Sequence, residues 1–276
     1  MPKLKASYKT LGKVSANLLS SLQSEGKTIF TIKDALKISQ KDYFATCDFL
    51  SELVKRNILA RIKSGKYLIL QSGAENTQLK NWPVIARELV LPSPYFISHY
   101  SAMRLHGMTT HPLFDICVTA PHRFTAKKVS DLKYRFIYCK KEHFWGDEPR
   151  WVTRQEKVQV SDLERTILDG LDRPDLCGGV LEVVRGIWTK KADLNSQKLL
   201  KYAKKFRTKA TLKRLGLILE TLKIKDDLAK ELFEMFEDSE DYILLDPDSS
   251  KEGKHLKRWH VIVNSNLEEL KESIWA

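Results

Sequence analysis

The sequence has few cysteines and no long apolar run, and both shortages limit where the protein is expected to work. Its four cysteines are widely spaced and form no C-x-x-C pair: Cys47, Cys117, Cys139 and Cys177. That spacing is typical of reduced, mostly buried thiols in a cytosolic protein. No apolar stretch approaches the ~20 residues of a membrane helix, and the first residues lack the apolar core of a secretory signal. We therefore expect a cytoplasmic protein without a membrane partner.

The short motifs of several enzyme classes are also missing. There is no G-x-S-x-G nucleophile elbow and no Gly-rich phosphate-binding loop, since residues 176–179 are better explained as a turn. His99, His106 and His111 lie close together, but their spacing fits no metal-binding motif such as H-E-x-x-H. We expect these histidines to have structural or capping roles. The sequence therefore predicts a protein that is not an enzyme, with no catalytic residue, no cofactor and no metal ion.

Positive charge is abundant. The 276 residues include 47 lysines and arginines against 35 aspartates and glutamates, a net charge of +12. Residues 1–80 hold 14 of these basic residues and only 6 acidic ones, so most of the excess falls in under a third of the chain. Because the composition is otherwise that of a globular protein, this excess favours a polyanionic partner such as nucleic acid.

Two short helix signals follow each other within this basic part of the chain. Thr31 and Asp34 have the spacing of a capping box, and Ser39 and Asp42 repeat it eight residues later. In each pair the hydroxyl is expected to cap free N–H groups, while the acid lies in the electropositive first turn. The second, longer helix is expected to end just before Asn57, which suits a left-handed helix stop.

A basic hairpin is expected directly after these helices. Residues 58–70 contain two β-prone runs around a Ser-Gly pair, which is flanked by Lys63 and Lys66. A further amphipathic helix is expected over residues 10–24. Two closely spaced helices followed by a basic hairpin predict a winged helix-turn-helix, a DNA-docking module, over residues 1–72.

Double-stranded DNA is the expected partner of this domain. Thr46, Leu50 and Leu53 form the inward side of the second helix, which leaves its opposite side for a DNA groove. Glutamine pairs with adenine, lysine reaches guanine or phosphate, and an aromatic ring contacts a thymine methyl group. The helix start and the hairpin tip suit phosphates. The predicted DNA-binding residues are Ser39, Gln40, Lys41, Tyr43, Phe44, Asp48, Lys55, Arg61, Lys63, Ser64 and Lys66.

A second, larger domain is expected over residues 79–276. Residues 71–78 are small and polar and indicate a linker. Beyond them helix and strand signals alternate, so the predicted class is α+β, with a winged helix-turn-helix followed by a mixed α/β domain. Expected helices cover residues 80–91, 98–106, 161–171, 178–189, 194–206, 210–223 and 226–237. Expected strands cover residues 114–120, 134–140, 151–160, 242–245 and 259–263, before a final short helix.

A second basic block lies in this domain. Residues 185–214 hold 11 lysines and arginines against one aspartate, whereas residues 226–248 hold 10 acidic residues against one lysine. We expect solvated helix faces that partly neutralise each other. The alternative is a second surface for phosphate or a partner protein. Its centre would be Lys204, Lys205, Arg207, Lys209, Lys213 and Arg214.

Two other functions stay open at this point. Asp115 on an expected strand, with Glu156 before basic residues, would suit a winged-helix-guided nuclease whose clustered carboxylates hold Mg²⁺ beside a lysine. Glu156 and Lys157 do not have the acid-x-Lys spacing of such a site. Winged helices also serve as protein-interaction modules without specific DNA binding, which is the second alternative.

Three segments of the second domain carry a family resemblance. Residues 94–107 (PYFISHYSAMRLHG) contain a strand, a helix and a turn similar to an SALxLHG signature. Residues 160–169 (VSDLERTILD) are similar to an S-x-x-E-R-x-L-L-D helix start, and residues 213–220 (KRLGLILE) are similar to an RRLGYLLE helix. In this order and behind a winged helix, these segments resemble the AbiEi family, the antitoxins of type IV toxin–antitoxin systems. The resemblance spans roughly residues 10–245.

The resemblance implies a cytoplasmic transcriptional regulator encoded beside a nucleotidyltransferase-like toxin. The winged helix would bind operator DNA and repress its own operon, and the second domain would counteract the toxin functionally rather than through a stable complex. The family's R-G-x-L before the wing is RNIL here at residues 56–59, and its RRGxY wing is KSGKY at residues 63–67. Lysine still supplies positive charge for phosphate. The resemblance assigns no catalytic residue.

Overall fold

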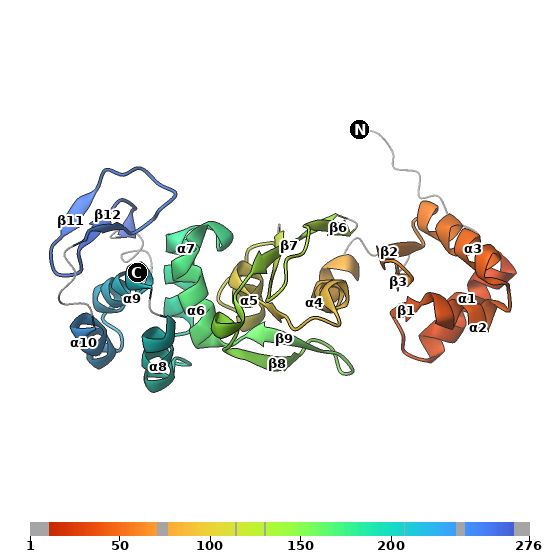
Figure 1. The fold of residues 1–276 in the computed structure, drawn as a ribbon, viewed down its shortest axis with the longest axis horizontal. Coiled ribbons are helices and arrows are strands. Elements are labelled where there is room, and N and C mark those ends of the chain that lie inside the picture. The colour runs from red at the N-terminus through yellow and green to blue at the C-terminus, as the bar shows by residue number, and fades with distance from the viewer. Residues whose placement is uncertain are drawn as a thin grey trace. The chain divides into compact units, whose positions relative to one another are not determined.

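The computed structural model describes residues 11–70, 77–113, 115–129, 131–206, 208–235 and 241–267. The chain divides into two compact units, Met1–Leu89 with Val129–Asp131 and Val90–Lys128 with Leu132–Ala276. Both units combine helices with strands, so the predicted α+β class is confirmed. Figure 1 follows the elements along the chain.

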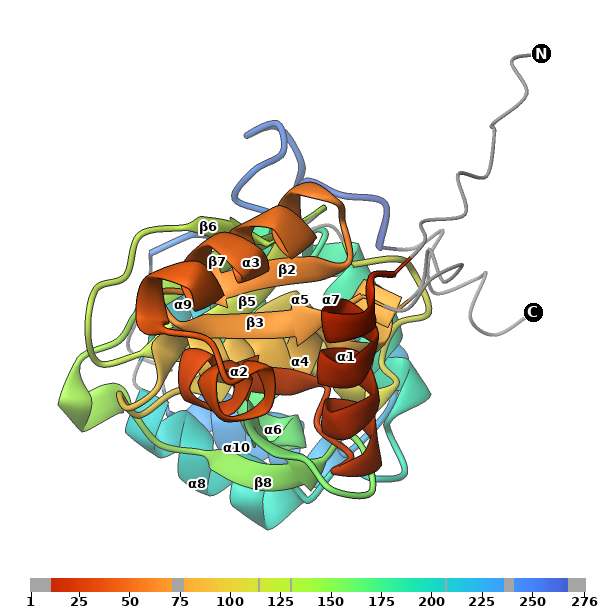
Figure 2. The ribbon, with the colours of Figure 1, turned by 90° about the vertical axis from the view of Figure 1, so that its right-hand side faces the viewer.

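The first unit packs helices against a small antiparallel sheet with the strand order β1-β3-β2. Its buried core includes Leu18, Leu22, Phe30, Leu50 and Leu53. Figure 2 shows α1, α2 and α3 grouped around β2 and β3. The helices are α1 (Lys13–Ser24), α2 (Ile32–Ser39), α3 (Tyr43–Lys55) and α4 (Thr77–Val90), and the strands are β1 (Ile29–Thr31), β2 (Leu59–Lys63) and β3 (Lys66–Ile69).

Short polar side chains set the starts of α2 and α3. Thr31 and Asp34 form the predicted capping box, in which the Thr31 hydroxyl accepts the Asp34 N–H (3.3 Å) and Asp34 accepts the Thr31 N–H (2.8 Å). The predicted cap at Ser39 is wrong, because α2 continues to Ser39 and Asp42 caps α3. The Asp42 carboxylate is a charged acceptor and takes the N–H three residues on at 2.8 Å. Between the helices Gln40 has φ of 53°, a left-handed stop for α2.

The hairpin after α3 forms as the sequence predicts. Asn57 has φ of 51° directly after the helix, and Gly65 has φ of 69° in the turn between β2 and β3. Glycine suits that turn because it enters the left-handed region without steric cost. Lys63 and Lys66 face each other across the hairpin, and β1 adds a third strand next to β3.

Helix α4 belongs with the first unit up to Leu89, although the sequence places it in the second domain. Most of the predicted linker at 71–78 lies outside the described residues. An ion pair connects α4 to the hairpin, since the Lys66 ammonium on β3 contacts the Glu88 carboxylate. Arg87 also donates to Glu88, at 3.0 Å. The first unit therefore extends beyond the predicted boundary because a charged contact links the hairpin to the next helix.

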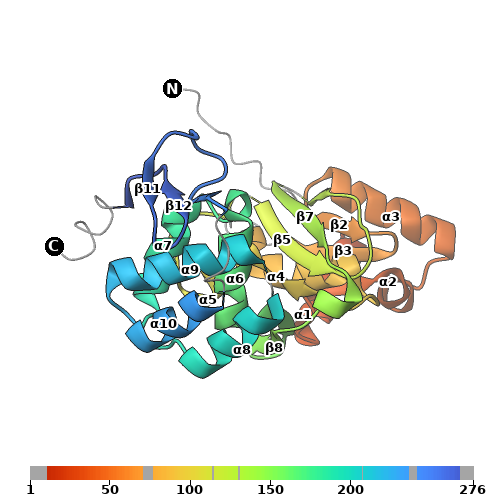
Figure 3. The same cartoon turned by 60° about the vertical axis from the view of Figure 1, so that its left-hand side comes forward.

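The second unit combines a six-stranded mixed sheet, a group of helices and a small three-stranded sheet (Figure 3). The large sheet has the order β6-β7-β5-β4-β9-β8, and its strands are β4 (Phe96–Ile97), β5 (Asp115–Ala120), β6 (Lys127–Val129), β7 (Leu132–Tyr138), β8 (Asp147–Trp151) and β9 (Lys157–Ser161). The helices are α5 (His99–His106), α6 (Leu163–Asp172), α7 (Val180–Thr189), α8 (Ser196–Phe206), α9 (Lys209–Leu222) and α10 (Asp226–Glu234). The small sheet contains β10 (Ile243–Leu244), β11 (Lys254–Leu256) and β12 (Val261–Val263).

Strand direction in the large sheet is mixed. β5 runs parallel to β7 and β4 runs parallel to β9, whereas the β4–β5 and β8–β9 pairs are antiparallel. The main apolar core lies among the helices, where α6, α7 and α9 contribute residues such as Leu168, Val183 and Leu215. Figure 3 shows α9 beside α10, with the small sheet close to α9. None of the described helices is long and apolar enough to span a bilayer.

Several local predictions for this unit need correction. Residues 151–160, predicted as one strand, contain the turn of the β8–β9 hairpin. In this turn the Glu156 backbone carbonyl accepts the Val152 N–H at 3.0 Å. The helix predicted from residue 161 begins at Leu163, because Asp162 is its cap and accepts the Arg165 N–H at 2.9 Å. Ser161 is the last residue of β9, so its backbone already pairs in the sheet. The predicted final helix lies mostly outside the described residues.

Candidate functional site

The start of α3 presents an exposed pair of aromatic side chains. Tyr43 is 55% exposed and Phe44 is 79% exposed, and their rings meet edge to face at 5.8 Å. Asp48 lies exposed one turn further on, while Thr46 and Leu50 are buried as predicted. Leaving two large rings in water sacrifices the hydrophobic gain that burial would provide, so this surface is suited to contact with a partner.

Three of the predicted contact residues lie before α3 rather than on it. Ser39 is the last residue of α2, where its hydroxyl contacts the Thr46 hydroxyl at 3.3 Å. Gln40 and Lys41 are exposed in the turn between the helices, and the Lys41 ammonium lies 5.8 Å from the centre of the Phe49 ring. The turn still places Gln40 and Lys41 next to the N-terminus of α3, where N–H groups point outward.

Basic side chains also surround the hairpin and the end of α3. Lys55 and Arg61 are exposed, Ser64 is exposed in the turn, and Lys63 is half-buried. Lys66 differs from these because its ammonium contacts Glu88 of α4. Lys66 is therefore no longer a candidate DNA contact, since its ammonium is already paired with the Glu88 carboxylate within the first unit.

The Glu88 carboxylate is buried, and its environment favours the charged form. Burial alone would raise the pKa of Glu88, but hydrogen bonds and charge from Lys66 and Arg87 outweigh burial and hold that pKa below its usual value. A buried carboxylate that remains ionised needs its cationic partners, because an unpaired charge in this setting is costly. The Lys66 side chain therefore stabilises the first unit through its ion pair with Glu88.

The second predicted basic surface is wrong at two of its positions. Lys213 is 1% exposed and donates to the Asp241 carbonyl at 2.5 Å. Arg214 is 6% exposed and donates to the carbonyls of Leu171 (2.8 Å) and Leu244 (3.0 Å). Both side chains donate to backbone carbonyl groups and so connect α9 to the segment around β10. Lys204, Lys205 and Lys209 are exposed, and Arg207 lies outside the described residues.

A cavity of about 490 Å³ lies in the second unit, next to α6. Arg165 of α6 is one of its lining residues and is held from several sides. Its Nε donates to Asp169 at 2.8 Å, and its Nη1 donates to the backbone carbonyls of His143 (3.1 Å) and Trp145 (3.2 Å). The guanidinium carbon lies 4.3 Å from the centre of the Trp145 ring and 5.2 Å from that of Phe206. The Arg165 position is therefore fixed before any ligand arrives.

Two polar atoms of residues that line this cavity have no hydrogen-bond partner within the part of the chain that the structure describes. They are Oδ2 of Asp169, an acceptor, and the Nε1 group of Trp145, a donor. Asp169 is 5% exposed, and its other oxygen is occupied by Arg165. Unpaired buried polar atoms are uncommon in folded proteins and require an explanation.

His99 lines the same cavity in an unusual backbone conformation. Its φ is 52°, in the left-handed region that side chains other than glycine rarely adopt. Its Nδ1 lies 2.8 Å from the Ser98 hydroxyl, which also accepts the Thr119 hydroxyl at 2.8 Å. Burial lowers the pKa of His99, so the ring is neutral near pH 7. Backbone strain of this kind often marks functional sites.

The tautomer of His106, by contrast, follows from its contacts. Arg150 can only donate, so its 3.1 Å contact makes Nδ1 of His106 an acceptor. Nε2 must then carry the proton that it donates to the Ser161 carbonyl at 2.7 Å. Burial is the main cause of the lowered pKa of His106, and Arg150 adds to it. The rings of His99 and His106 thus both contact polar groups of the second unit, and their predicted structural role stays a prediction.

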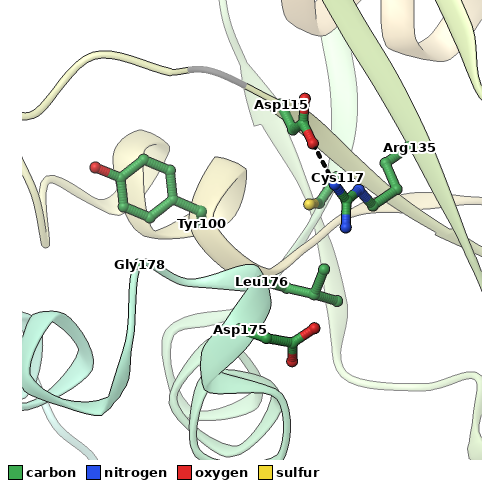
Figure 4. Close-up of a pocket in the computed structure, with 7 residues that line it drawn as sticks. All are labelled: Tyr100, Asp115, Cys117, Arg135, Asp175, Leu176 and Gly178. Atoms are coloured by element: carbon green, nitrogen blue, oxygen red, sulfur yellow. Dashed lines mark hydrogen bonds and ion pairs between the residues drawn. The ribbon is translucent and has the colours of Figure 1, made fainter. Parts of the chain in front are cut away.

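A smaller cavity of about 260 Å³ contains Asp115, the carboxylate of the nuclease alternative. Figure 4 shows Arg135 directed at Asp115. Nη2 of Arg135 donates to Oδ2 of Asp115 at 2.5 Å. Tyr100 and Cys117 form other parts of the cavity wall. Burial raises the pKa of the Cys117 thiol to about 12, so it is not a thiolate at neutral pH. Among the residues that the structure describes, no group of three or more histidine, cysteine or acidic side chains is placed to hold a metal ion.

In the sequence, Arg165 and Asp169 stand out only as parts of a helix signature. Their i,i+4 spacing would have indicated an ion pair on one helix face. The walls contributed by Tyr138 and Trp145 had no local signal, because these residues lie on β7 and in the segment before β8 and meet α6 only in the fold.

Comparison with known proteins shows a likeness in fold. The sequence matches no family model and no curated protein. The fold is similar to the crystal structure of the Rv2827c protein from Mycobacterium tuberculosis, with a TM-score of 0.69 and 13% sequence identity over 97% of each chain. At this level of identity the likeness concerns the fold alone.

Proposed function

We propose that the first unit is a winged-helix DNA-binding domain and that the protein is a cytoplasmic autorepressor and antitoxin of the AbiEi type. The observation that carries the proposal is the exposed start of α3. There Tyr43 and Phe44 project from the first turn of a helix that is followed directly by a basic hairpin. The element order α1-β1-α2-α3-β2-β3 with a three-stranded antiparallel sheet supports the same interpretation.

In this proposal α3 enters the major groove with its N-terminal end. Phe44 contacts a thymine methyl group, and Gln40 and Lys41 reach base edges or phosphate from the preceding turn. Asp48, one turn later, accepts from a cytosine amino group, because near phosphate alone its charge would repel the duplex. Lys55 and Arg61 are assigned to phosphates at the groove edges, which fix position rather than sequence.

The antitoxin activity belongs to the second unit in this proposal and rests on the three resembling segments. We expect it to oppose a nucleotidyltransferase-like toxin encoded next to this protein. Growth of cells that produce this toxin tests the expectation. The full chain should restore the growth of these cells. Restored growth by a full-chain variant that no longer binds DNA would support separate functions of the two units. Failure of the full chain to rescue growth rejects the antitoxin assignment but leaves DNA binding untouched.

DNA binding is tested by titrating the full chain against the duplex upstream of its coding sequence and a shuffled duplex. Replacing Lys41 and Arg61 by alanine should weaken binding to both duplexes. It should also reduce the slope of log K against log salt by about two units, roughly 0.9 per lost phosphate contact. The matched control is the Lys204→Ala and Lys209→Ala pair, which removes the same charge from exposed sites of the second unit. Equal losses for both pairs would reject the proposed interface.

Phe44→Ala separates DNA recognition from protein recognition at the same surface. A base contact predicts a larger loss for the specific than for the shuffled duplex, by about 1–3 kcal/mol. The exposed Tyr43–Phe44 pair would also suit a protein partner, which is the second candidate function. Unchanged DNA binding by Phe44→Ala, together with loss of co-purification with the adjacent gene product, would favour that candidate.

A further inference from the structure

The side of α3 that faces water presents its side chains in a fixed order. Thr46, Leu50 and Leu53 form the buried side of this helix. At about 3.6 residues per turn, the exposed residues opposite them form one line, which consists of Phe44, Asp48, Ser51 and Lys55. We call these four residues the exposed line of α3. An aromatic ring, a carboxylate, a hydroxyl and an ammonium group therefore follow one another along the surface that is proposed to face DNA.

Asp48 lies inside this line, and its carboxylate is available to a partner. Within the part of the chain that the structure describes, the Asp48 side chain forms no hydrogen bond and no ion pair. A carboxylate accepts hydrogen bonds and has no proton to donate. Phosphate oxygens are acceptors as well and carry the same sign of charge, so Asp48 gains nothing from the DNA backbone. It requires a partner group that offers an N–H.

The major groove of DNA offers N–H groups only on the exocyclic amino groups of cytosine (N4) and adenine (N6). In an A·T pair the amino group lies between two acceptors, N7 of adenine and O4 of thymine, and both repel a carboxylate. In a G·C pair the amino group of cytosine has an acceptor on one side only, O6 of guanine, because the other neighbour is the C5–H of cytosine itself. Cytosine is therefore the base that suits Asp48.

We propose that methylation of a cytosine amino group in the operator releases this protein from DNA, because Asp48 accepts a hydrogen bond from that group. This inference rests on the DNA binding by α3 proposed above and adds its regulation. One N4–H of cytosine pairs with guanine, and the other points into the major groove. A methyl group on N4 takes the place of the proton that Asp48 accepts. A methyl group on the neighbouring C5 atom leaves that proton in place, so only methylation of the amino group removes the contact.

Fluorescence-anisotropy titration of the full chain against the duplex upstream of its coding sequence tests this inference. Each cytosine of the duplex is replaced in turn by N4-methylcytosine and, in a second series, by 5-methylcytosine. We expect at least one position at which N4-methylcytosine weakens binding roughly 5- to 150-fold, the range that corresponds to the loss of one base contact. At the same position 5-methylcytosine should change the affinity by less than about twofold, because the amino group keeps both protons.

Two variants separate base recognition from charge. Asp48→Ala and Glu52→Ala each remove one exposed carboxylate from α3, but Glu52 lies beside the exposed line and not on it. Both variants should bind a shuffled duplex more tightly than the parent protein, because each repels phosphate less. Only Asp48→Ala should lose the difference between the unmodified and the N4-methylated operator, whereas Glu52→Ala should keep it. Melting temperatures show that both variants are folded, and general loosening of the fold would not change this ratio of affinities.

Two results would overturn this inference and leave the proposed DNA binding intact. One is specific binding of the unmodified operator with the same affinity for every N4-methylated duplex. The other is an Asp48→Ala variant that distinguishes the unmodified from the N4-methylated operator as the parent protein does. Equal affinity of the parent protein for the operator and the shuffled duplex would instead reject specific DNA binding itself, and the inference with it.

Discussion

Lysine and arginine side chains are exposed at one place in the first unit and buried at another place in the second unit. In the first unit Lys41 and Arg61 extend into solvent from a turn and from a strand of the hairpin. In the second unit Lys213 and Arg214 are buried and donate to backbone carbonyls of distant segments. Burial is the main reason that the pKa values of Lys213 and Arg214 lie below their usual values. A basic run in a sequence therefore indicates a binding surface only when its side chains remain in contact with water.

The difference follows from the connections that each unit must make. In the first unit the turn before α3 and the hairpin leave Lys41 and Arg61 at the surface, whereas Lys66 pairs with Glu88. The second unit brings β10 and β12 back to α9 from farther along the chain. The carbonyl groups of Leu171, Asp241 and Leu244 lie close to α9, and the long side chains of Lys213 and Arg214 reach them.

Arg214→Met should produce the largest change in stability. It leaves the carbonyls of Leu171 and Leu244 without their donor, and each buried unpaired group costs about 1–3 kcal/mol. We expect a loss of roughly 2–5 kcal/mol in the free energy of unfolding, measured with urea. Arg61→Met, the same substitution at an exposed site, should change that free energy by less than about 0.5 kcal/mol while weakening DNA binding. Similar losses for both variants would remove the contrast between the units.

Gly216→Ala should come next. A Cβ atom at Gly216 would lie 1.9 Å from the nearest atom of the Trp259 ring, which is buried against α9. Because the ring cannot move aside without disturbing its Nε1 hydrogen bond to Glu220 (2.8 Å), we expect a loss of about 1–3 kcal/mol. Gly12→Ala, where no atom of the described residues other than Gly12 and its chain neighbours lies within 4 Å of the added Cβ, is the control and should cost less than about 1 kcal/mol. Thermal unfolding compares the two.

Lys66→Met sharpens the comparison inside the first unit. Its ammonium contacts Glu88, so the variant should lose about 1–2 kcal/mol of stability and retain most of its DNA affinity. The free energy of unfolding lost by Lys66→Met should become smaller at acid pH. The pKa of Glu88 is lowered in the folded protein, so its stabilising effect is present above the unfolded pKa and disappears as the pH falls through the folded pKa. A large loss of DNA affinity with unchanged stability would return Lys66 to the interface.

His106 should produce the smallest effect. Its folded pKa lies below the unfolded value of about 6.5, so the unfolded chain takes up the proton first as the pH falls. The stability that neutral His106 provides is therefore complete above pH 6.5 and is lost as the pH falls through the folded pKa. Urea unfolding at pH 7.5 and pH 5 should show a smaller difference for His106→Gln than for the parent protein. His99, whose pKa is also lowered, contributes in the same direction and remains in both proteins.

Local chemistry predicts much of the fold. The Thr31–Asp34 capping box, the Asn57 stop and the Gly65 turn each depend on a few adjacent residues, and all three form as expected. The predicted cap at Ser39 is wrong because two acceptors, Ser39 and Asp42, lie within four residues of each other. The Asp42 carboxylate is the stronger acceptor and takes the N–H group of Ala45. The shortest strands, such as β4 and β11, contain two or three residues and have no periodicity that a sequence pattern reveals.

The sequence by itself determined the alternation of helices and strands, the closely spaced helix pair with its hairpin, and the excess of positive charge at the N-terminal end. All of these depend on residues within a few positions of one another, where capping, periodicity and turn preferences act. Only the tertiary structure decided which charges face water, that Lys66 neutralises Glu88, and that Asp169 and Trp145 line one cavity with unpaired polar atoms. Burial and pairing depend on distances between segments far apart in the chain, and these distances exist only after folding.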